Sequence, residues 1–552
     1  MSTKHSGALA LTWANKERRL LSHENGTYEW VDPTDFRVSE VRLLHGVTSV
    51  GEVHSDRQRA KDNLLIRGDS LHALTSLLRI PEFASEYEGK VKLVYIDPPF
   101  NTGQAFTHYD DGLEHSVWLT MLRDRLTQIK RLLSEDGSVW IHLDDYEQHR
   151  ARVVLDEVFG QQNFVATIIW QKMKSRDNRS AVSSTHDYIH VYARQSVIWK
   201  TVRNLLPRTE EAAARYKNPD NDPRGPWTSG DLSAQAGHGT AAQFYDLTLP
   251  SGRVIQPPTG RCWLFSQDRY NELVRENRVW FGADGNNVPR LKRFLSEVQG
   301  GLVPMSIWQA TEVDTNDAAK KEIKEMFAGV TPFDTPKPER LMERIIHIGS
   351  NPGDIVLDCF AGSGTTAAVA QKMGRRWVTC EWSAENVATF TLPRLEKVVE
   401  GDDPGGVTEQ VGWEGGGGFR LLDVAPSVYE VQDSTILLSE KVTAGELAES
   451  VAAQLGFAYE PDGVFVGTKG RMRLVVIDGV LNDDIVRILV TALKEKERVT
   501  VVATAAEPGA EDLLRNLSVG SKVRKVPRDL ARLSKRRSEV VQLVLDGLGD
   551  SE

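Results

Sequence analysis

The feature that most constrains this chain is an alternation of short apolar runs with amphipathic helical segments. The alternation occupies residues 61–170 and returns in 331–400. Mainly apolar runs such as Val91–Ile96, in which Lys92 is the one charged residue, are typical of parallel strands buried on both faces. The sequence therefore predicts an α/β fold built on a doubly wound, mostly parallel sheet.

The periodic pattern is interrupted once and then followed by a second, smaller α/β stretch. Between the two periodic regions, Pro, Gly, Asn and scattered aromatic residues are frequent, and Gly415–Gly418 mark a later linker. We expect an N-terminal arm at 1–60, two halves of one domain at 61–170 and 331–400, an insert at 171–330, a Gly-rich linker at 401–420, and a small C-terminal α/β domain at 421–552.

The charge distribution is uneven. The formal net charge is −10, which argues against a protein that coats polyanions indiscriminately. Residues 171–224 nevertheless hold 11 Lys and Arg against 6 Asp and Glu, and eight of the sixteen residues in Lys522–Arg537 are basic. Nucleic-acid contacts are therefore expected on local basic segments. For the run at 522–537, the alternatives are contact with DNA, contact with a partner subunit, or a solvated tail.

Few residues suggest disulfides, metals or membranes. The three cysteines are too few for a disulfide framework or a four-ligand zinc site, and we expect Cys359 and Cys380 to pack in the core of a cytoplasmic protein. We interpret the group His142, Asp144, Asp145 and His149 as a solvated strand end, with no metal. Apolar runs all fall short of the roughly 18–20 residues that a membrane span needs.

The first motif that carries chemistry is the glycine-rich loop Asp358–Thr366, between an expected strand and helix. Glycines let the backbone approach a ligand, and the amides at a helix start attract a carboxylate or phosphate. Glu381 ends the next strand 19 positions after Gly362, where a carboxylate can accept from ribose hydroxyls. The loop indicates a nucleoside cofactor, and its spacing also satisfies the loose dinucleotide fingerprint, so an NAD enzyme stays an alternative.

The second motif, Asp97-Pro98-Pro99-Phe100, follows the buried run Val91–Ile96. Proline stiffens the turn, so a carboxylate and a backbone carbonyl can point outward together as acceptors for both hydrogens of an amino group. Phe100 offers a flat face for a planar base. The structural alternative is a strand-end turn with a core phenylalanine. Together, the two motifs predict a methyltransferase that acts on the amino group of a base.

Both motifs strongly resemble those of the β group of DNA amino-methyltransferases, in which the amine-binding motif precedes the cofactor motif. Further resemblances lie at 67–70, 183–189 and 335–341. In the size of the chain and the order of its motifs, the sequence is most similar to the modification subunits of Type III restriction systems. The resemblance covers 61–400. Phe100 departs from the pattern, because tyrosine is commoner at that position.

The resemblance implies a Rossmann-like fold that binds S-adenosylmethionine. Glu381 would hold the ribose, Asp69 or a neighbour the adenine edge, and the Gly362–Thr366 turn the methionine end. Asp358 would orient the loop or meet the methionine ammonium, and Lys337 would meet the carboxylate or lie on the surface. The implied catalytic residues are Asp97, Pro98, Pro99 and Phe100, and the implied cofactor residues are Asp69, Asp358, Phe360, Ala361, Gly362, Ser363, Gly364, Thr365, Thr366, Glu381 and Lys337.

The implied activity is methyl transfer to the N6 amino group of a flipped adenine in duplex DNA, with the 171–330 insert as the target-recognition domain. Cytosine-N4 transfer uses the same amine chemistry and stays open, as does a catalytically silent DNA-binding subunit. The alternative for the insert is a structural insertion. As partners, the resemblance implies DNA and allows a restriction or helicase-nuclease subunit and a homodimer.

Overall fold

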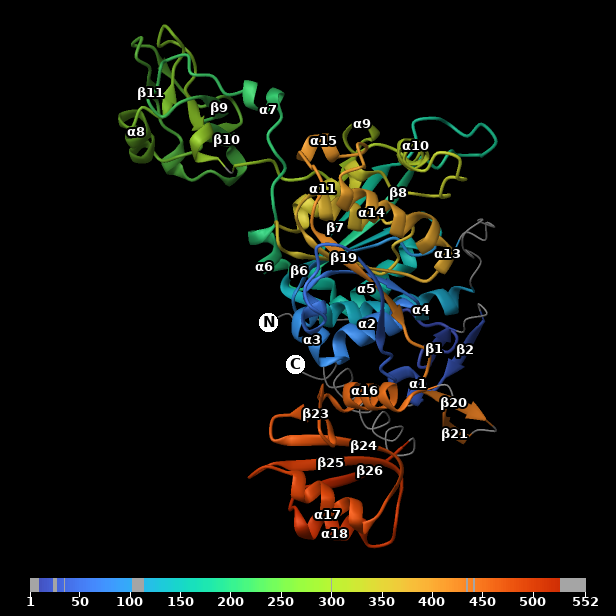
Figure 1. Cartoon of the computed structure of the whole chain (residues 1–552). Coiled ribbons are helices and arrows are strands. Elements are labelled where there is room, and N and C mark those ends of the chain that lie inside the picture. Colours follow the sequence, from blue (N-terminus) through green and yellow to red (C-terminus); the bar gives the residue numbers. More distant parts are fainter. Residues whose placement is uncertain are drawn as a thin grey trace. The chain divides into compact units, whose positions relative to one another are not determined.

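The computed structural model describes residues 9–22, 27–33, 35–101, 114–298, 300–432, 435–439 and 442–526 (Figure 1). The chain divides into two compact units, one formed by Met1–Asn204 with Met305–Glu552 and the other by Leu205–Pro304. Among the described helices, none is long and apolar enough to cross a membrane.

A ten-stranded sheet forms the centre of the first unit. In spatial order its strands are β16 (Ile307–Trp308), β7 (Phe164–Gln171), β8 (His186–Ala193), β6 (Leu133–Leu143), β5 (Val91–Ile96), β17 (Ile355–Asp358), β18 (Arg376–Glu381), β4 (Asn63–Arg67), β19 (Gly418–Val424) and β3 (Leu44–Gly51).

The six strands from β6 to β19 in this order are all parallel to their neighbours. Strand β5 continues along the chain to β6 on one side, whereas β17 continues to β18 on the other. The strand order therefore reverses between β5 and β17, and ligands of open α/β sheets bind at such a reversal, outside the carboxyl ends of the strands. The predicted doubly wound, mostly parallel fold is confirmed.

Helices cover both faces of the sheet, because the strands are apolar on both faces. Helices α2 (Ser70–Arg79), α4 (His115–Leu132) and α5 (Gln148–Phe159) lie on one side in Figure 1, and α11 (Glu339–Gly349) and α14 (Leu392–Glu400) on the other. Helix α12 (Thr365–Lys372) packs with α11 and α14, and α3 (Pro81–Tyr87) with α2. Fully buried tryptophans, among them Trp118 on α4 and Trp377 on β18, fill the space between sheet and helices.

The expected insert at 171–330 is wider than the unit that the structure separates. Strands β8 and β16 fall inside that range yet belong to the central sheet, where β8 pairs antiparallel with both β6 and β7. Helices α6 (Ser196–Val202), α9 (Ala310–Val313) and α10 (Asn316–Met326) also belong to the first unit. Only 205–304 form a separate unit, because the flanking segments gain a continuous backbone ladder by joining the sheet.

The second unit has a small core of its own, formed around Trp263, Tyr270 and Leu273. Strands β9 (Trp227–Asp231), β15 (Arg290–Phe294) and β14 (Val279–Trp280) form one sheet, with β15 central. Its other elements are α7 (Glu210–Ala214), α8 (Gln267–Arg275) and the strand pairs β10 (Ser233–Gln235) with β13 (Arg261–Trp263) and β11 (Leu247–Thr248) with β12 (Val254–Ile255).

The arm and the Gly-rich segment are more regular than expected. Strand β3 of the expected arm pairs with β19, which begins at Gly418. A Cβ at Gly418 would lie 2.5 Å from the carbonyl oxygen of Val50, so this glycine allows close strand contact rather than serving as a flexible linker. The arm also forms a hairpin of β1 (Arg19–Ser22) and β2 (Tyr28–Val31), followed by α1 (Phe36–Ser39).

The short helix α15 (Thr408–Val411) precedes β19, and the hairpin of β20 (Tyr429–Gln432) and β21 (Thr435–Leu438) follows it. The C-terminal part then forms the expected small α/β structure. Its five-stranded sheet has the order β22 (Ala458–Asp462), β23 (Phe465–Lys469), β24 (Met472–Leu481), β25 (Arg498–Ala506) and β26 (Lys522–Lys525), with helices α16 (Ala444–Leu455), α17 (Asp483–Ala492) and α18 (Ala510–Leu517). The basic run at 522–537 lies in β26 at its start and outside the described residues from 527 onward.

Candidate active site

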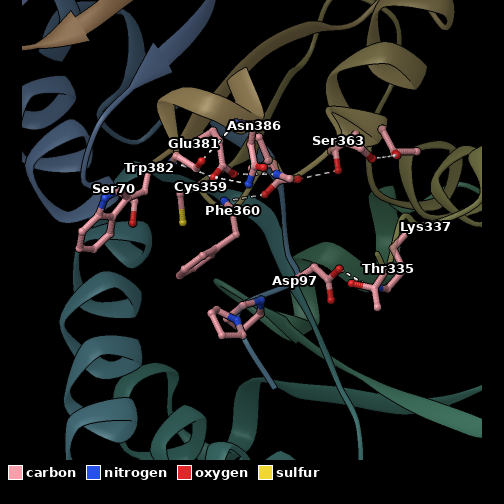
Figure 2. Close-up of a pocket in the computed structure, with 18 of the residues that line it drawn as sticks. Ser70, Asp97, Thr335, Lys337, Cys359, Phe360, Ser363, Glu381, Trp382 and Asn386 are labelled. Carbon is pink, nitrogen blue, oxygen red and sulfur yellow. Dashed lines mark hydrogen bonds and ion pairs between the residues drawn. The ribbon is translucent and has the colours of Figure 1, made fainter. Parts of the chain in front are cut away.

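A cavity of about 710 Å³ opens at the strand reversal between β5 and β17 (Figure 2). The loop after β5 and the loop after β17 both line it, so the two sequence motifs meet although 261 positions separate Asp97 from Asp358. All the predicted site residues line this cavity except Asp69 and Gly364.

Asp97 directly follows β5, and Asp358 is the last residue of β17. They come together because β5 and β17 are adjacent parallel strands whose carboxyl ends lie at the same edge of the sheet. The sheet topology, and not closeness in sequence, therefore assembles the site.

The loop after β5 is held in a fixed conformation. The indole Nε1 of Trp118 donates to the carbonyl of Pro99 at 2.7 Å, and Asn101 takes a left-handed φ of 62° directly after Phe100. The Asn101 amide donates to Glu147 at 2.8 Å. Because Pro99 is bonded to α4 and Asn101 to the N-cap residue of α5, the loop that carries Asp97 and Pro98 is positioned before any ligand binds.

Lys337 forms an ion pair with Oδ2 of Asp97. The lysine side chain is only 6% exposed, and its ammonium also lies 5.2 Å from the centre of the Phe100 ring. The alternative of a surface lysine is therefore wrong, and the residue contacts the loop after β5. Oδ1 of Asp97 is buried and has no hydrogen-bond partner among the described residues, so one acceptor of this carboxylate is left for a ligand.

The buried side chain of His142 packs against Phe100. His142 stacks near the Phe100 ring at a centroid distance of 5.9 Å, and its ring nitrogens lie 2.9 Å from the Tyr95 hydroxyl and 3.2 Å from Asp187. The interpretation of His142 as part of a solvated strand end is wrong, because the side chain is fully buried. Burial lowers the pKa of His142, which favours the neutral ring. No metal-binding group of His, Cys, Asp and Glu occurs among the described residues.

Asp358 ends β17 and organises the glycine-rich loop. Its carboxylate accepts from the Phe360 amide at 2.9 Å and from the Thr366 hydroxyl at 2.6 Å. Burial raises the pKa of Asp358 from its ordinary value of 3.8 to about 7, against the effect of these two hydrogen bonds. The negative charges of Asp97 and Glu381 add to the rise.

The glycines of this loop have different tasks. Gly362 lines the cavity with a φ of +53°, and a Cβ there would lie 3.3 Å from the Phe333 ring. Gly364 is the left-handed N-cap residue of α12 and does not line the cavity.

Glu381 ends β18 beside the loop. Its carboxylate accepts from the Gly362 amide at 2.9 Å and from the Ser383 amide at 3.0 Å, and burial raises its pKa. Asn386, from α13 (Ala384–Asn386), also lines the cavity, and its Oδ1 is buried without a hydrogen-bond partner among the described residues. These acceptors suit hydroxyl or ammonium donors of a ligand.

A buried ion-pair network connects the glycine-rich loop to helices α11, α12 and α14. Arg394 donates to the Thr365 hydroxyl at 2.9 Å and to Glu339 at 2.8 Å. Lys372 bridges Glu339 at 2.8 Å and Asp403 at 2.6 Å, and all these charged side chains are at most 3% exposed. The network holds α11, α12 and α14 together around the loop.

Asp69, one of the residues expected at the adenine edge, does not line the cavity. It is the N-cap of α2, where it accepts from the Leu71 amide at 2.7 Å, and it pairs with Arg125 at 2.8 Å. Its neighbour Ser70 lines the cavity in its place.

Several lining residues were not predicted. They share a position on the cavity wall: Tyr28, Ser70, Tyr95, Met121, Arg125, Phe333, Thr335, Trp382, Ser383 and Asn386. Ser70 and Trp382 directly follow predicted residues, so their place in the sequence was a usable signal. Tyr28 and Arg125 carry no local signal, because only the packing of the arm and of α4 brings them to the cavity.

Comparisons with known proteins agree with this geometry. The profile of the N6/N4 methyltransferase family, described as DNA methylase, matches residues 91–391. The StyLTI Mod subunit of a type III restriction-modification enzyme from Salmonella typhimurium is 32% identical over 55% of this chain and 49% of its own length. The type II methyltransferase M1.MboII from Moraxella bovis is 59% identical over 57% of this chain and 94% of its own length.

A third relative, the DNA adenine methyltransferase YhdJ from Escherichia coli K12, is 24% identical over 60% of this chain and 82% of its own length. The chain thus spans about half the length of the StyLTI Mod subunit that it matches.

Proposed function

Because the chain belongs to the DNA methylase family, we propose that it transfers a methyl group from S-adenosyl-L-methionine to the N6 amino group of adenine in duplex DNA. The observation that carries the proposal is the free, buried Oδ1 of Asp97 in the same cavity as the Gly362 loop and Glu381. An acceptor for an amino group and a loop suited to a nucleoside therefore line the same cavity.

The loop after β5 would hold the target amine. Oδ1 of Asp97 accepts one hydrogen, and because Trp118 already donates to the Pro99 carbonyl, we assign the second acceptor to the Pro98 carbonyl. With both hydrogens held, the nitrogen lone pair points away from the loop. S-adenosyl-L-methionine supplies an electrophilic methyl group on a positively charged sulfur. Holding the two reactants in line is expected to supply most of the rate.

A general base is not required from His142. Burial favours its neutral form, and both ring nitrogens already have partners in Tyr95 and Asp187. The new nitrogen–carbon bond makes the amine cationic, so its proton leaves readily afterwards.

The residues that line the cavity fit the cofactor. Glu381 and the partnerless Oδ1 of Asn386 are acceptors for ribose hydroxyls or the ammonium group, and the Gly362–Thr366 turn offers a close backbone approach. Phe360 and Trp382 offer flat faces for adenine. We therefore keep the proposed roles of Glu381 and the loop, and assign the adenine end to Ser70 and its neighbours in place of Asp69.

Unit 205–304 is the proposed target-recognition domain. A base inside a duplex cannot reach the cavity and must be flipped out, at a cost of a few kcal/mol. A separately folded insertion in the catalytic domain can supply DNA contacts without disturbing the sheet. The relatives named as restriction-modification subunits support DNA modification beside a restriction partner.

The test is transfer of tritiated methyl groups from S-adenosyl-L-methionine to duplex DNA by the purified protein. Asp97→Ala should abolish transfer and keep cofactor binding, whereas Glu88→Ala, at a surface carboxylate, should leave transfer unchanged. Full activity of Asp97→Ala would refute the role of this carboxylate.

Methylation-aware sequencing of DNA from an expressing host identifies the modified base and its context. N4-methylcytosine in place of N6-methyladenine would favour the cytosine alternative. Absence of both cofactor binding and transfer would favour a silent DNA-binding subunit.

A further inference from the structure

The N-terminal hairpin of β1 and β2 brings a residue from outside the matched family region to the cavity. Tyr28, at the start of β2, lines the cavity and packs against the main hydrophobic core, whereas the family profile begins at residue 91. A segment that the motifs do not predict is thus part of the cavity wall.

The hairpin is firmly held on α4. Arg19 pairs with Asp124 at 2.9 Å, and Arg123 donates to the carbonyl of Arg18 at 2.9 Å. Leu20, the next residue of β1, is only 4% exposed. These contacts fix the hairpin before a ligand binds, so its place at the cavity is a property of the folded chain.

The same helix also lines the cavity. Met121 and Arg125 of α4 are on the wall, and Arg125 donates to the Ser70 hydroxyl at 2.6 Å and lies 5.9 Å from the centre of the Phe360 ring. The charge of Arg125 is paired with Asp69. This end of the cavity is therefore aromatic and charge-compensated, which suits a neutral planar ring better than a phosphate.

This end lies apart from the amine acceptor. Ser70 and Trp382 follow β4 and β18, which pair at Arg67 and Glu381, and Figure 2 draws both residues on the opposite side of the cavity from Lys337. The ribose acceptor Glu381 directly precedes Trp382. A cofactor with its ribose at Glu381 and its methyl group toward Asp97 places its adenine at this end.

We propose that the N-terminal hairpin is a wall of the cofactor site and that Tyr28 contacts the adenine of S-adenosyl-L-methionine. The inference rests on the proposed function. Tyr28 acts by packing its ring on the adenine, so removal of the ring weakens binding of the cofactor and leaves the chemistry at Asp97 unchanged.

The experiment measures the affinity of the full-length protein for S-adenosyl-L-methionine by calorimetry. Tyr28→Ala should weaken binding by about tenfold, Tyr28→Phe should bind within about twofold of the wild type, and kcat at saturating cofactor should stay within about twofold. Glu29→Ala is the matched control, because adjacent strand residues point to opposite faces and Glu29 does not line the cavity.

Adenosine and methionine as competing probes separate a local effect from a general loss of fold. Weaker competition by adenosine alone supports the proposal, whereas equal weakening of both probes, or wild-type affinity of Tyr28→Ala, overturns it. A wild-type protein that binds no S-adenosyl-L-methionine would overturn the proposed function itself, and this inference with it.

Discussion

Affinity for S-adenosyl-L-methionine should fall about tenfold between pH 8 and pH 6, because Asp358 takes up a proton in the free protein. Burial raises the pKa of this carboxyl to about 7, and Asp358 lines the cavity that would receive the cationic cofactor. A bound cation favours the ionised carboxylate, so binding should release the proton.

The sign and size follow from this pKa. At pH 6 about nine-tenths of the free protein carries the proton and must lose it on binding, which weakens the apparent affinity about 11-fold. At pH 8 the carboxyl is already ionised and the penalty is about 1.1-fold. At pH 7 about half a proton should be released for each cofactor bound.

Calorimetry at pH 6, 7 and 8, in buffers with different ionisation enthalpies, measures both the dissociation constant and the proton count. Asp358→Asn should flatten the pH dependence of the dissociation constant. Glu381→Gln measures how much the raised pKa of Glu381 adds to this pH dependence. A dissociation constant of the wild type that varies less than twofold over this range, or an undiminished slope in Asp358→Asn, would refute the reasoning.

Two further substitutions test charged pairs. Lys337→Met leaves Asp97 without its cation and should lower the single-turnover methyl-transfer rate about 100-fold, or about 3 kcal/mol, with cofactor affinity within threefold; an unchanged rate would show that the pair has no role. Lys372→Met removes the cation beside the buried Asp403 and leaves Glu339 paired with Arg394 alone, so the free energy of unfolding in urea denaturation should fall by about 3–5 kcal/mol. A loss below about 1 kcal/mol would contradict the stabilising role of the network.

Local sequence determined the strands, the helices and the residues at their ends. The run Val91–Ile96, apolar except for Lys92, became β5 with the same bounds, because burial between two layers stabilises a mainly apolar strand. Strand ends of a parallel sheet share one edge, so the loops at Asp97 and Asp358 could be placed together from sequence alone.

Only the tertiary structure decided which distant segments complete the sheet and the cavity. Strand β8 joined the sheet although it lies within the expected insert, and Lys337 reached Asp97 across 240 positions. Tyr28 came to the cavity with a hairpin held by α4. Such contacts depend on the packing free energy of segments far apart in the chain, which local periodicity and motif spacing do not encode.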